Sequence, residues 1–307
     1  MRVNLITSCV SAKNTTVGDT VALTDAFAKG CNSAEEWLNT LSGKADEMLS
    51  LLDLYKGDHW SIAKNLNTLK DVTLWVVSAG LGFAHHSKLA RPYDATFNKS
   101  SPNFVGNIEL NKLTIDPTKS WWSLLHKNQN AFKKLVKKYP EDMYIFCSSE
   151  SYLVAIENDL LDLVHKGLFN ESNFLIITSN SKINKNLNRF VLKSKEKFSS
   201  SEQIKGSMVS LNIRLARYLI QASINAPYPL KKMIEVYKEL DHSLPDTIRK
   251  KINRLNDSDV MNEISKLPNS SLKSATSALR ALRDKGISCE QKRFSRLFAK
   301  YHSSLEF

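Results

Sequence analysis

Four short apolar segments constrain the fold more than any other feature of this 307-residue chain. Each is almost continuously apolar instead of alternating, which is typical of strands covered on both faces. Strands that are separated by helical patterns predict right-handed crossovers and a parallel sheet. The sequence therefore predicts a three-layer α/β/α domain over residues 1–225, with a four-stranded, mainly parallel sheet. The predicted strands are Val3–Thr7, Val72–Val77, Met143–Cys147 and Phe174–Thr178.

Helical periodicity fills the intervals between these strands and continues to the end of the chain. In the first domain, helices are predicted at 34–55, 59–69, 121–139, 151–168 and 207–222. Pro227 and Pro229 then disfavour helix and indicate a boundary. The remainder, residues 226–307, is predicted to be a small helical domain. Its helices are expected at 230–240, 246–255, 257–265, 271–285 and 290–302.

The net charge of +12 is unevenly distributed along the chain. Residues 1–181 contain 18 Lys and Arg against 19 Asp and Glu, whereas residues 182–307 contain 25 against 12. Segregated positive charge favours a surface that binds a polyanion, most simply nucleic acid. An acidic protein partner or a membrane surface is the alternative. Segment 182–203 is polar and basic and is expected to be a surface loop.

Several classes of protein are excluded by what the sequence lacks. It has no phosphate-binding loop, dinucleotide fingerprint, HExxH motif or G-x-S-x-G elbow, so no cofactor and no metal site are expected. Cys9, Cys31, Cys147 and Cys289 have no metal-ligand spacing and are expected to be reduced thiols. The absence of a signal-like start and of a long apolar run predicts a cytoplasmic protein, expected to be a monomer.

Small polar residues follow all four predicted strands. In open parallel sheets, ligands bind beyond the carboxyl ends of the strands, so these residues predict a polar rim there. The loop over residues 81–119 is long enough to be a binding loop, and within it Asp94 follows a Pro-Tyr pair. One carboxylate beside uncharged polar groups suits hydrolysis of an N-glycosidic bond, since it can orient water and stabilise a positive sugar. The alternatives are that Asp94 caps its own turn and that residues such as Ser149 only cap helices.

Four short motifs resemble one protein family in their order and spacing. They are Ser8-Cys-x-x-x-Lys13, Leu54-Tyr-x-Gly57, Val77-Ser-Ala-x-x-Gly82 and Pro92-Tyr-Asp94. The series resembles that of prokaryotic anti-phage DNA glycosylases with a uracil-DNA-glycosylase-like fold, and is distantly similar to the peroxide-stress protein YaaA. The chain departs from the family at Gly80, where relatives often have lysine.

The resemblance implies that a modified base is flipped out of phage DNA and excised, leaving an abasic site. Asp94 would activate the water, and Tyr93 or Phe83 would stack on the base. The other residues implied in contacts to base, sugar or phosphate are Ser8, Cys9, Lys13, Tyr55, Ser78, Gly80 and Ser149. Two alternatives stay open: base exchange on RNA or nucleotides, and DNA binding without catalysis.

The last third of the chain contains a predicted helix, a glycine turn and a second helix. Basic residues cluster on this pair and are expected to hold DNA phosphates, with a helix start adding N–H donors. The alternative is a solvated helical hairpin packed by its own leucines and phenylalanines. The predicted DNA-binding residues are Lys273, Ser274, Arg280, Arg283, Lys285, Lys292 and Arg293.

Overall fold

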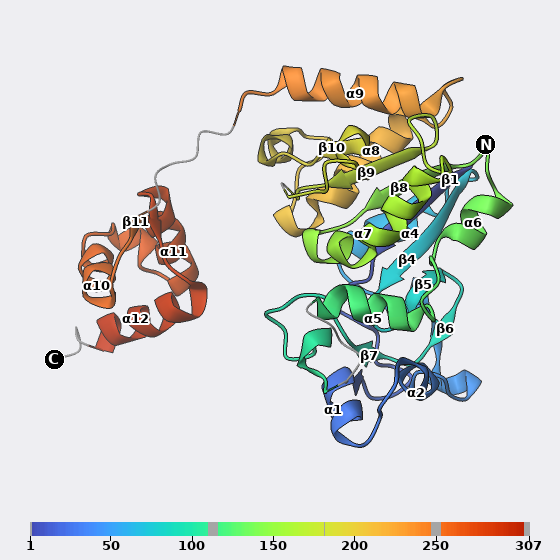
Figure 1. Cartoon of the computed structure of the whole chain (residues 1–307). Coiled ribbons are helices and arrows are strands. Elements are labelled where there is room, and N and C mark those ends of the chain that lie inside the picture. Colours follow the sequence, from blue (N-terminus) through green and yellow to red (C-terminus); the bar gives the residue numbers. More distant parts are fainter. Residues whose placement is uncertain (1, 110–115, 181, 247–252, 304–307) are drawn as a thin grey trace. The chain divides into compact units, whose positions relative to one another are not determined.

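A computed structural model describes residues 2–109, 116–180, 182–246 and 253–303 of the chain (Figure 1). The chain divides into two compact units, Met1–Pro245 and Asp246–Phe307. The larger unit contains a six-stranded sheet in the order β10-β9-β8-β1-β4-β5. These strands are β1 (Val3–Ser8), β4 (Val72–Ser78), β5 (Gly82–His85), β8 (Met143–Cys147), β9 (Phe174–Thr178) and β10 (Val191–Lys193).

The four predicted strands are all present and pair in parallel, so the mainly parallel sheet is confirmed. The predicted number of four strands is wrong, because one further strand lies on each lateral side of the sheet. β5 runs antiparallel to β4 after a tight turn in which Gly82 has a φ of +71°, a conformation that favours glycine. β10 pairs in parallel with β9 inside the segment expected to be a surface loop. With three residues, β10 is too short to show a strand pattern.

Helices cover both faces of this sheet, which confirms the layered α/β/α arrangement (Figure 1). On one face, the Thr7 side chain of β1 lies 2.8 Å from the ring of His59 in α4. On the other face, the Phe146 ring of β8 packs against Phe132 and Phe169, which flank the helices there. The first layer holds α4 (Asp58–Leu66) and α8 (Leu211–Ser223), and the second holds α5 (Pro117–Leu125), α6 (Lys133–Lys138) and α7 (Glu150–His165).

Two of the long predicted helices are broken into shorter elements. In the segment predicted as one helix over 121–139, α5 ends at Leu125. Lys127 and Asn128 have positive φ angles of 52° and 59°, which are incompatible with a right-handed helix. The segment 34–55 contains two α-helices separated by a 3-10 turn and a short strand, and the Ser50 side chain caps the second α-helix. Its elements are α2 (Ala34–Thr40), η1 (Ala45–Glu47), β3 (Leu49–Ser50) and α3 (Leu51–Leu54).

Short strand pairs hold much of the predicted binding loop in place. β7 (Tyr93–Asp94) pairs in parallel with β2 (Val21–Ala22), which precedes α1 (Leu23–Ala28). β6 (Leu89–Ala90) pairs antiparallel with β3. The loop also contains η2 (Val105–Asn107), and its residues 110–115 lie outside the described residues.

The boundary predicted after residue 225 is wrong, because α9 (Pro229–Ser243) belongs to the larger unit. Its side chains Leu230, Met233 and Val236 join the core of that unit, and α9 packs against α8. The apolar face of α9 is therefore buried against residues that precede it in the chain, which makes α9 part of the larger unit.

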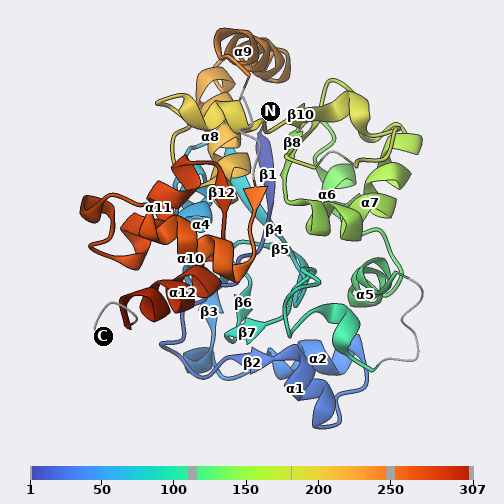
Figure 2. The ribbon, with the colours of Figure 1, turned by 90° about the vertical axis from the view of Figure 1, so that its left-hand side faces the viewer.

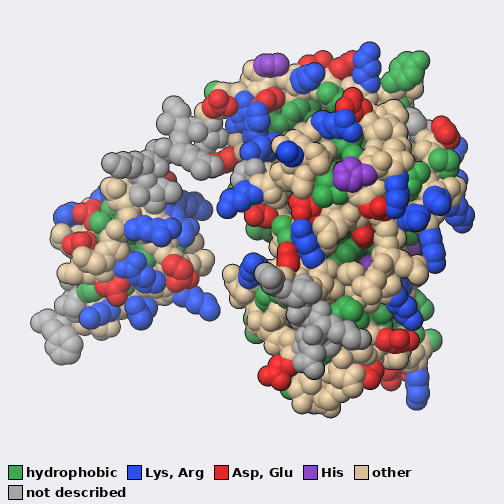
Figure 3. Space-filling view, in the orientation of Figure 1, with side chains coloured by type: hydrophobic (Ala, Val, Ile, Leu, Met, Phe, Trp, Pro, Cys, Tyr) green, Lys and Arg blue, Asp and Glu red, His purple; other side chains and the backbone are tan. Residues whose placement is uncertain are grey.

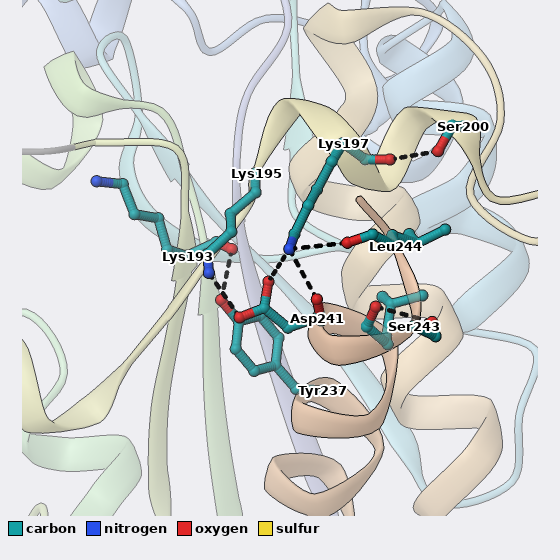
Figure 4. A network of polar contacts seen from close by, with 9 residues as sticks. Lys193, Lys195, Lys197, Ser200, Tyr237, Asp241, Ser243 and Leu244 are labelled. Carbon is teal, nitrogen blue, oxygen red and sulfur yellow. Dashed lines mark hydrogen bonds and ion pairs between the residues drawn. The ribbon is translucent and has the colours of Figure 1, made fainter. Parts of the chain in front are cut away.

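A polar network fixes the end of α9 to the basic segment near β10 (Figure 4). Asp241 accepts ion pairs from Lys195 at 2.6 Å and from Lys197 at 3.0 Å. Lys197 also donates to the backbone carbonyls of Asp241 and Leu244, at the helix end where a cation is favourable. These two lysines neutralise a carboxylate of their own chain. The chain between β9 and α8 also forms η3 (Asn188–Phe190), η4 (Glu196–Ser200) and η5 (Met208–Ser210).

The described residues of the smaller unit form a small helical body, drawn in orange and red in Figure 2. Its three described α-helices share an apolar cluster of their own. Val260, Leu282 and Phe294 are fully buried, one from each helix. β11 (Asn253–Arg254) pairs in parallel with β12 (Ile287–Ser288). A helix was predicted over 246–255, and the end of that segment is a strand instead. Residues 247–252 of that prediction lie outside the described residues. Its remaining elements are α10 (Asp257–Ser265), η6 (Asn269–Ser271), α11 (Ala275–Asp284) and α12 (Gln291–Ser303). Within the described ranges of both units, every helix is too short or too polar to cross a lipid bilayer.

Candidate active site at the carboxyl edge of the sheet

The motifs singled out in the sequence come together beyond the ends of β1 and β4. Lys13 and Tyr55 form an isolated antiparallel bridge, with the backbone N of Asn14 donating to the Leu54 carbonyl at 2.7 Å. The backbone N of Cys9 donates to the Val77 carbonyl at 2.9 Å. Loops that are far apart in the chain, such as those at Cys9 and Val77, therefore meet at one end of the parallel strands, as the topology requires.

Three buried hydroxyl groups form a chain at this edge. Ser78 Oγ accepts the backbone N–H groups of Gly80 and Leu81, each at 3.1 Å. Both of its lone pairs are then used, so its own hydrogen is donated to Tyr93 Oη, 2.5 Å away. Tyr93 Oη and Tyr55 Oη share the next hydrogen bond, also 2.5 Å. Burial raises the pKa values of both tyrosines well above their ordinary range, so both stay neutral.

Tyr93 is enclosed and cannot stack on a base as the sequence predicted. The Lys13 ammonium lies over the ring, 4.6 Å from its centroid, and the side chain is completely buried. A Cβ atom added at Gly80 would come within 2.4 Å of the same ring. The lysine that the resembled family often has at this position would collide with Tyr93, which gives a physical reason for the glycine here.

Asp94 is held from one side and open on the other. Its Oδ2 accepts a hydrogen bond from Asn103 Nδ2 at 2.9 Å, and Asn103 Oδ1 accepts one from Thr24 Oγ1 at 2.7 Å. The side chain is partly exposed, and within the described part of the chain no donor reaches Oδ1. Asp94 therefore does not cap its own turn. Its carboxylate has one fixed oxygen and one oxygen that is free to bind water.

Lys13 supplies a positive charge beside this carboxylate. Its Nζ donates to the backbone carbonyls of Val10 at 3.1 Å and Ser11 at 3.2 Å. Burial lowers the pKa of Lys13, while the nearby Asp94 carboxylate acts in the opposite direction. The ammonium is thus positioned within electrostatic range of Asp94 by the backbone of its own loop.

Three residues that the sequence analysis did not identify complete the surroundings of the site. Tyr152 in α7 hydrogen-bonds Cys9 Sγ at 3.1 Å, and Asn103 orients Asp94. His59 in α4 meets Thr7 at the end of β1, and burial lowers its pKa to about 4. Thr7 donates its hydrogen to the Cys147 carbonyl, so it accepts from His59 Nε2. These residues are single polar side chains in otherwise ordinary helix or loop sequence, so no motif distinguishes them.

Two predicted site residues do not join the cluster. Phe83 lies in β5 with its ring stacked on Trp75 at 5.1 Å and against Phe132, so the expected stacking on a substrate base at this edge is wrong. Ser149 is exposed at the start of α7, and its hydroxyl meets only Ser151, at 3.4 Å. The remaining two predicted residues contribute differently: Ser8 is buried at the end of β1, and Gly80 acts through its backbone, whose carbonyl accepts Trp37 Nε1 at 2.7 Å.

The predicted DNA-binding residues of the smaller unit fall into two groups. Lys285 pairs with Glu263, Arg293 pairs with Asp257, and Arg283 donates to the Cys289 carbonyl. In contrast, three predicted cations are exposed and form no ion pair with the described residues; they are Lys273, Arg280 and Lys292. Ser274 caps α11 by accepting from the backbone N of Ser277 at 3.2 Å. Lys and Arg side chains are prominent on the face of this unit shown in Figure 3, with acidic side chains among them.

The four cysteines are free thiols, and of these only Cys31 is not fully buried. Among the residues that the structure describes, His, Cys, Asp and Glu side chains form no group of three that could hold a metal ion. Comparison with protein families finds no matching model, and comparison with curated protein sequences finds no similar one.

Proposed function

We propose that the larger unit is a DNA glycosylase that excises a base by hydrolysing its N-glycosidic bond. The observation that carries the proposal is the position of Asp94, with one oxygen held by Asn103 and the other open, beside the Lys13 ammonium. The glycosidic bond breaks through a transition state with positive charge on the sugar, which a nearby carboxylate stabilises.

In the proposed reaction, the two oxygens of Asp94 have different roles. Oδ2, bound to Asn103, fixes the carboxyl plane, and Oδ1 orients the water that attacks the sugar carbon. The water adds its oxygen to that carbon, its proton passes to Asp94, and the base leaves with the bonding electrons. Lys13 is the cation of the site and suits a contact with the phosphate next to the excised nucleotide.

The smaller unit would hold the DNA. Lys273, Arg280 and Lys292 are exposed and unpaired with other described residues, as phosphate-binding side chains need to be. The family resemblance adds modified bases of phage DNA as the substrate and the cytoplasm as the place of action.

The test is base release from DNA. Purified protein is incubated with genomic DNA from phages that carry modified bases and from phages that do not, and released bases are identified by mass spectrometry while abasic sites are counted by alkaline cleavage. We expect release from modified DNA, reduced about 10²- to 10⁴-fold in Asp94→Asn. Asp53→Asn, an exposed carboxylate paired with Lys64, is the matched control and should retain full activity.

Three outcomes would contradict the proposal. Equal activity of Asp94→Asn and wild type would remove the catalytic role of this carboxylate. Incorporation of a free base without an abasic product would indicate base exchange. DNA binding with no released base on any substrate would indicate a protein that only binds.

A further inference from the structure

A second region of the larger unit has the features of a binding site. It is a hollow of about 530 Å³ at the opposite edge of the sheet, by the amino ends of β1 and β4. Its lining includes aromatic side chains of β4 and β5 and several residues of α6. Trp75 pairs with His85 and Val77 with Phe83, so the side chains of Trp75, Phe83 and His85 project from the same face.

The aromatic side chains of the lining are held by contacts within the protein. The rings of Trp75 and Phe83 are nearly parallel, 5.1 Å apart with an angle of 18° between their planes. The indole N–H of Trp75 donates to Asn4 Oδ1 at 2.9 Å, and Asn4 Nδ2 donates to Asp142 Oδ2 at 3.2 Å. The only polar atom of the indole is therefore satisfied within the protein. Because Phe83 is stacked on the ring, what remains available to a ligand is the part of the indole surface that Phe83 leaves uncovered.

Trp75 is unusual among the tryptophans of this chain. Trp37, Trp60, Trp121 and Trp122 are at most 3% exposed, whereas Trp75 is only partly buried. A large aromatic side chain that stays accessible, with its ring plane fixed, is a common feature of surfaces on which a nucleic-acid base stacks.

The charges around the hollow favour an anion. Arg2, Lys134 and Lys138 line the hollow, and none of them forms an ion pair with a described residue. The one carboxylate of the lining, Asp142, already accepts from the backbone N of Arg2 and from Asn4. Burial lowers the pKa of His85, so its ring is neutral near pH 7. The lining therefore holds three solvent-exposed cations and one carboxylate that already accepts hydrogen bonds.

We propose that this hollow binds one nucleotide of a single-stranded nucleic acid, with the base on Trp75 and the phosphate on Arg2, Lys134 and Lys138. Bases in a duplex are already stacked on their neighbours, so the exposed ring face selects an unpaired base. The site is separate from the carboxyl-edge cluster, and it does not depend on the proposed glycosylase activity.

The experiment uses the fluorescence of Trp75 in the full chain. Because the other four tryptophans are buried, a base that stacks on Trp75 should quench the accessible part of the emission. The probes are a short oligothymidylate, the same sequence as a duplex with oligoadenylate, and thymidine 5′-monophosphate. We expect quenching that saturates with the single strand and is weaker with the duplex. Equal affinity for the monophosphate and the oligomer would identify a free nucleotide as the ligand, which overturns the assignment to a strand.

Two double variants of α6 separate this site from general attraction to a basic surface. Lys134→Gln with Lys138→Gln removes two lining cations, and we expect about tenfold weaker binding and a shallower dependence on salt. Lys133→Gln with Lys137→Gln removes the same charge from the same helix outside the lining and should change affinity less than about twofold.

A third variant tests the ring itself. Trp75→Leu removes the stacking surface, and binding is then followed by the anisotropy of a labelled oligothymidylate; we expect at least about a tenfold loss, with circular dichroism confirming the fold. The proposal is overturned if wild-type fluorescence does not respond to millimolar probe, or if both double variants weaken binding equally. Base release by the wild type is measured separately, so failure here leaves the glycosylase proposal unaffected.

Discussion

Hydroxyl groups that meet at the carboxyl ends of the strands of the central sheet are buried, whereas the cations at the amino ends are accessible. At the carboxyl edge, the hydroxyls of Ser78, Tyr93 and Tyr55 are buried and bonded to one another. At the amino edge, Trp75 and the cations around it are accessible, and the cations have no charged partners among the described residues. Buried, mutually bonded groups fix a geometry, whereas exposed groups without partners are available to a ligand. Asp94 lies between these extremes, with one oxygen bound by Asn103 and one open, which suits the catalytic role that we propose for it.

The largest effect should come from releasing the bound oxygen of Asp94. Asn103→Ala removes the hydrogen bond to Oδ2 while leaving the carboxylate in place, and we expect base release to fall about 100-fold because the water is no longer aligned. Since Asn103 acts through Asp94, Asn103→Asp should be at least as inactive, because it places a second negative charge beside the first. Thr24→Val removes the hydrogen bond from Thr24 to Asn103, which lies one step further from Asp94, and should reduce base release much less. An unchanged rate in Asn103→Ala would show that Asp94 needs no orientation.

A stability measurement compares buried and exposed tyrosines at the two edges. Tyr93→Phe leaves the Ser78 hydroxyl and the Tyr55 hydroxyl buried without their shared partner, so we expect unfolding free energy to fall by about 2–3 kcal/mol. Tyr139→Phe at the amino edge removes a hydroxyl from a side chain that is 37% exposed and should change stability by less than about 0.5 kcal/mol. Urea unfolding measures both. Equal losses would mean that the hydroxyl chain does not hold the carboxyl edge together.

The smallest expected effect concerns pH. Burial lowers the folded-state pKa of His59 from 6.5 to about 4. Between these values the unfolded chain binds a proton that the folded protein does not, so stability falls as the pH is lowered from 6.5 towards 4. We expect this residue to contribute about 1–2 kcal/mol of that loss, because its partial exposure reduces the effect.

His59→Gln keeps a donor for Thr7 but cannot titrate, so its stability should vary less with pH in this range. The control is His85→Gln at the amino edge, where the histidine is close to solvent and its pKa is lowered less strongly. Urea unfolding at pH 7, 5.5 and 4.5 would distinguish them. A pH profile of His59→Gln that matches the wild type would contradict the assignment.

Much of the fold could be predicted because its strands are covered on both faces. Val72–Val77 and the other three predicted strands are almost continuously apolar, and short runs of that kind between helical patterns are typical of buried parallel strands. The edge strands β5 and β10 could not be predicted, because they are short and only partly covered. The position of α9 also escaped prediction. Two prolines precede it, but its place is decided by packing on α8 and by the ion pairs of Asp241, neither of which is a local property.

The site was predictable at the level of loops but not of side-chain directions. The motif residues Lys13, Tyr55, Ser78 and Tyr93 do meet, since the ends of parallel strands share one edge. The sequence could not show that Tyr93 turns its hydroxyl inward under Lys13. The amino-edge hollow left no motif at all, because its residues are single positions in distant segments.

The short edge strands have a consequence for how the protein behaves at high concentration. A sheet can recruit another chain only through a free row of backbone N–H and C=O groups at its margin. Here one margin is β10, three residues long and ending in Lys193, and the other is the four-residue β5. Neither offers enough length for intermolecular strand addition, so the parallel core is protected from edge-to-edge aggregation.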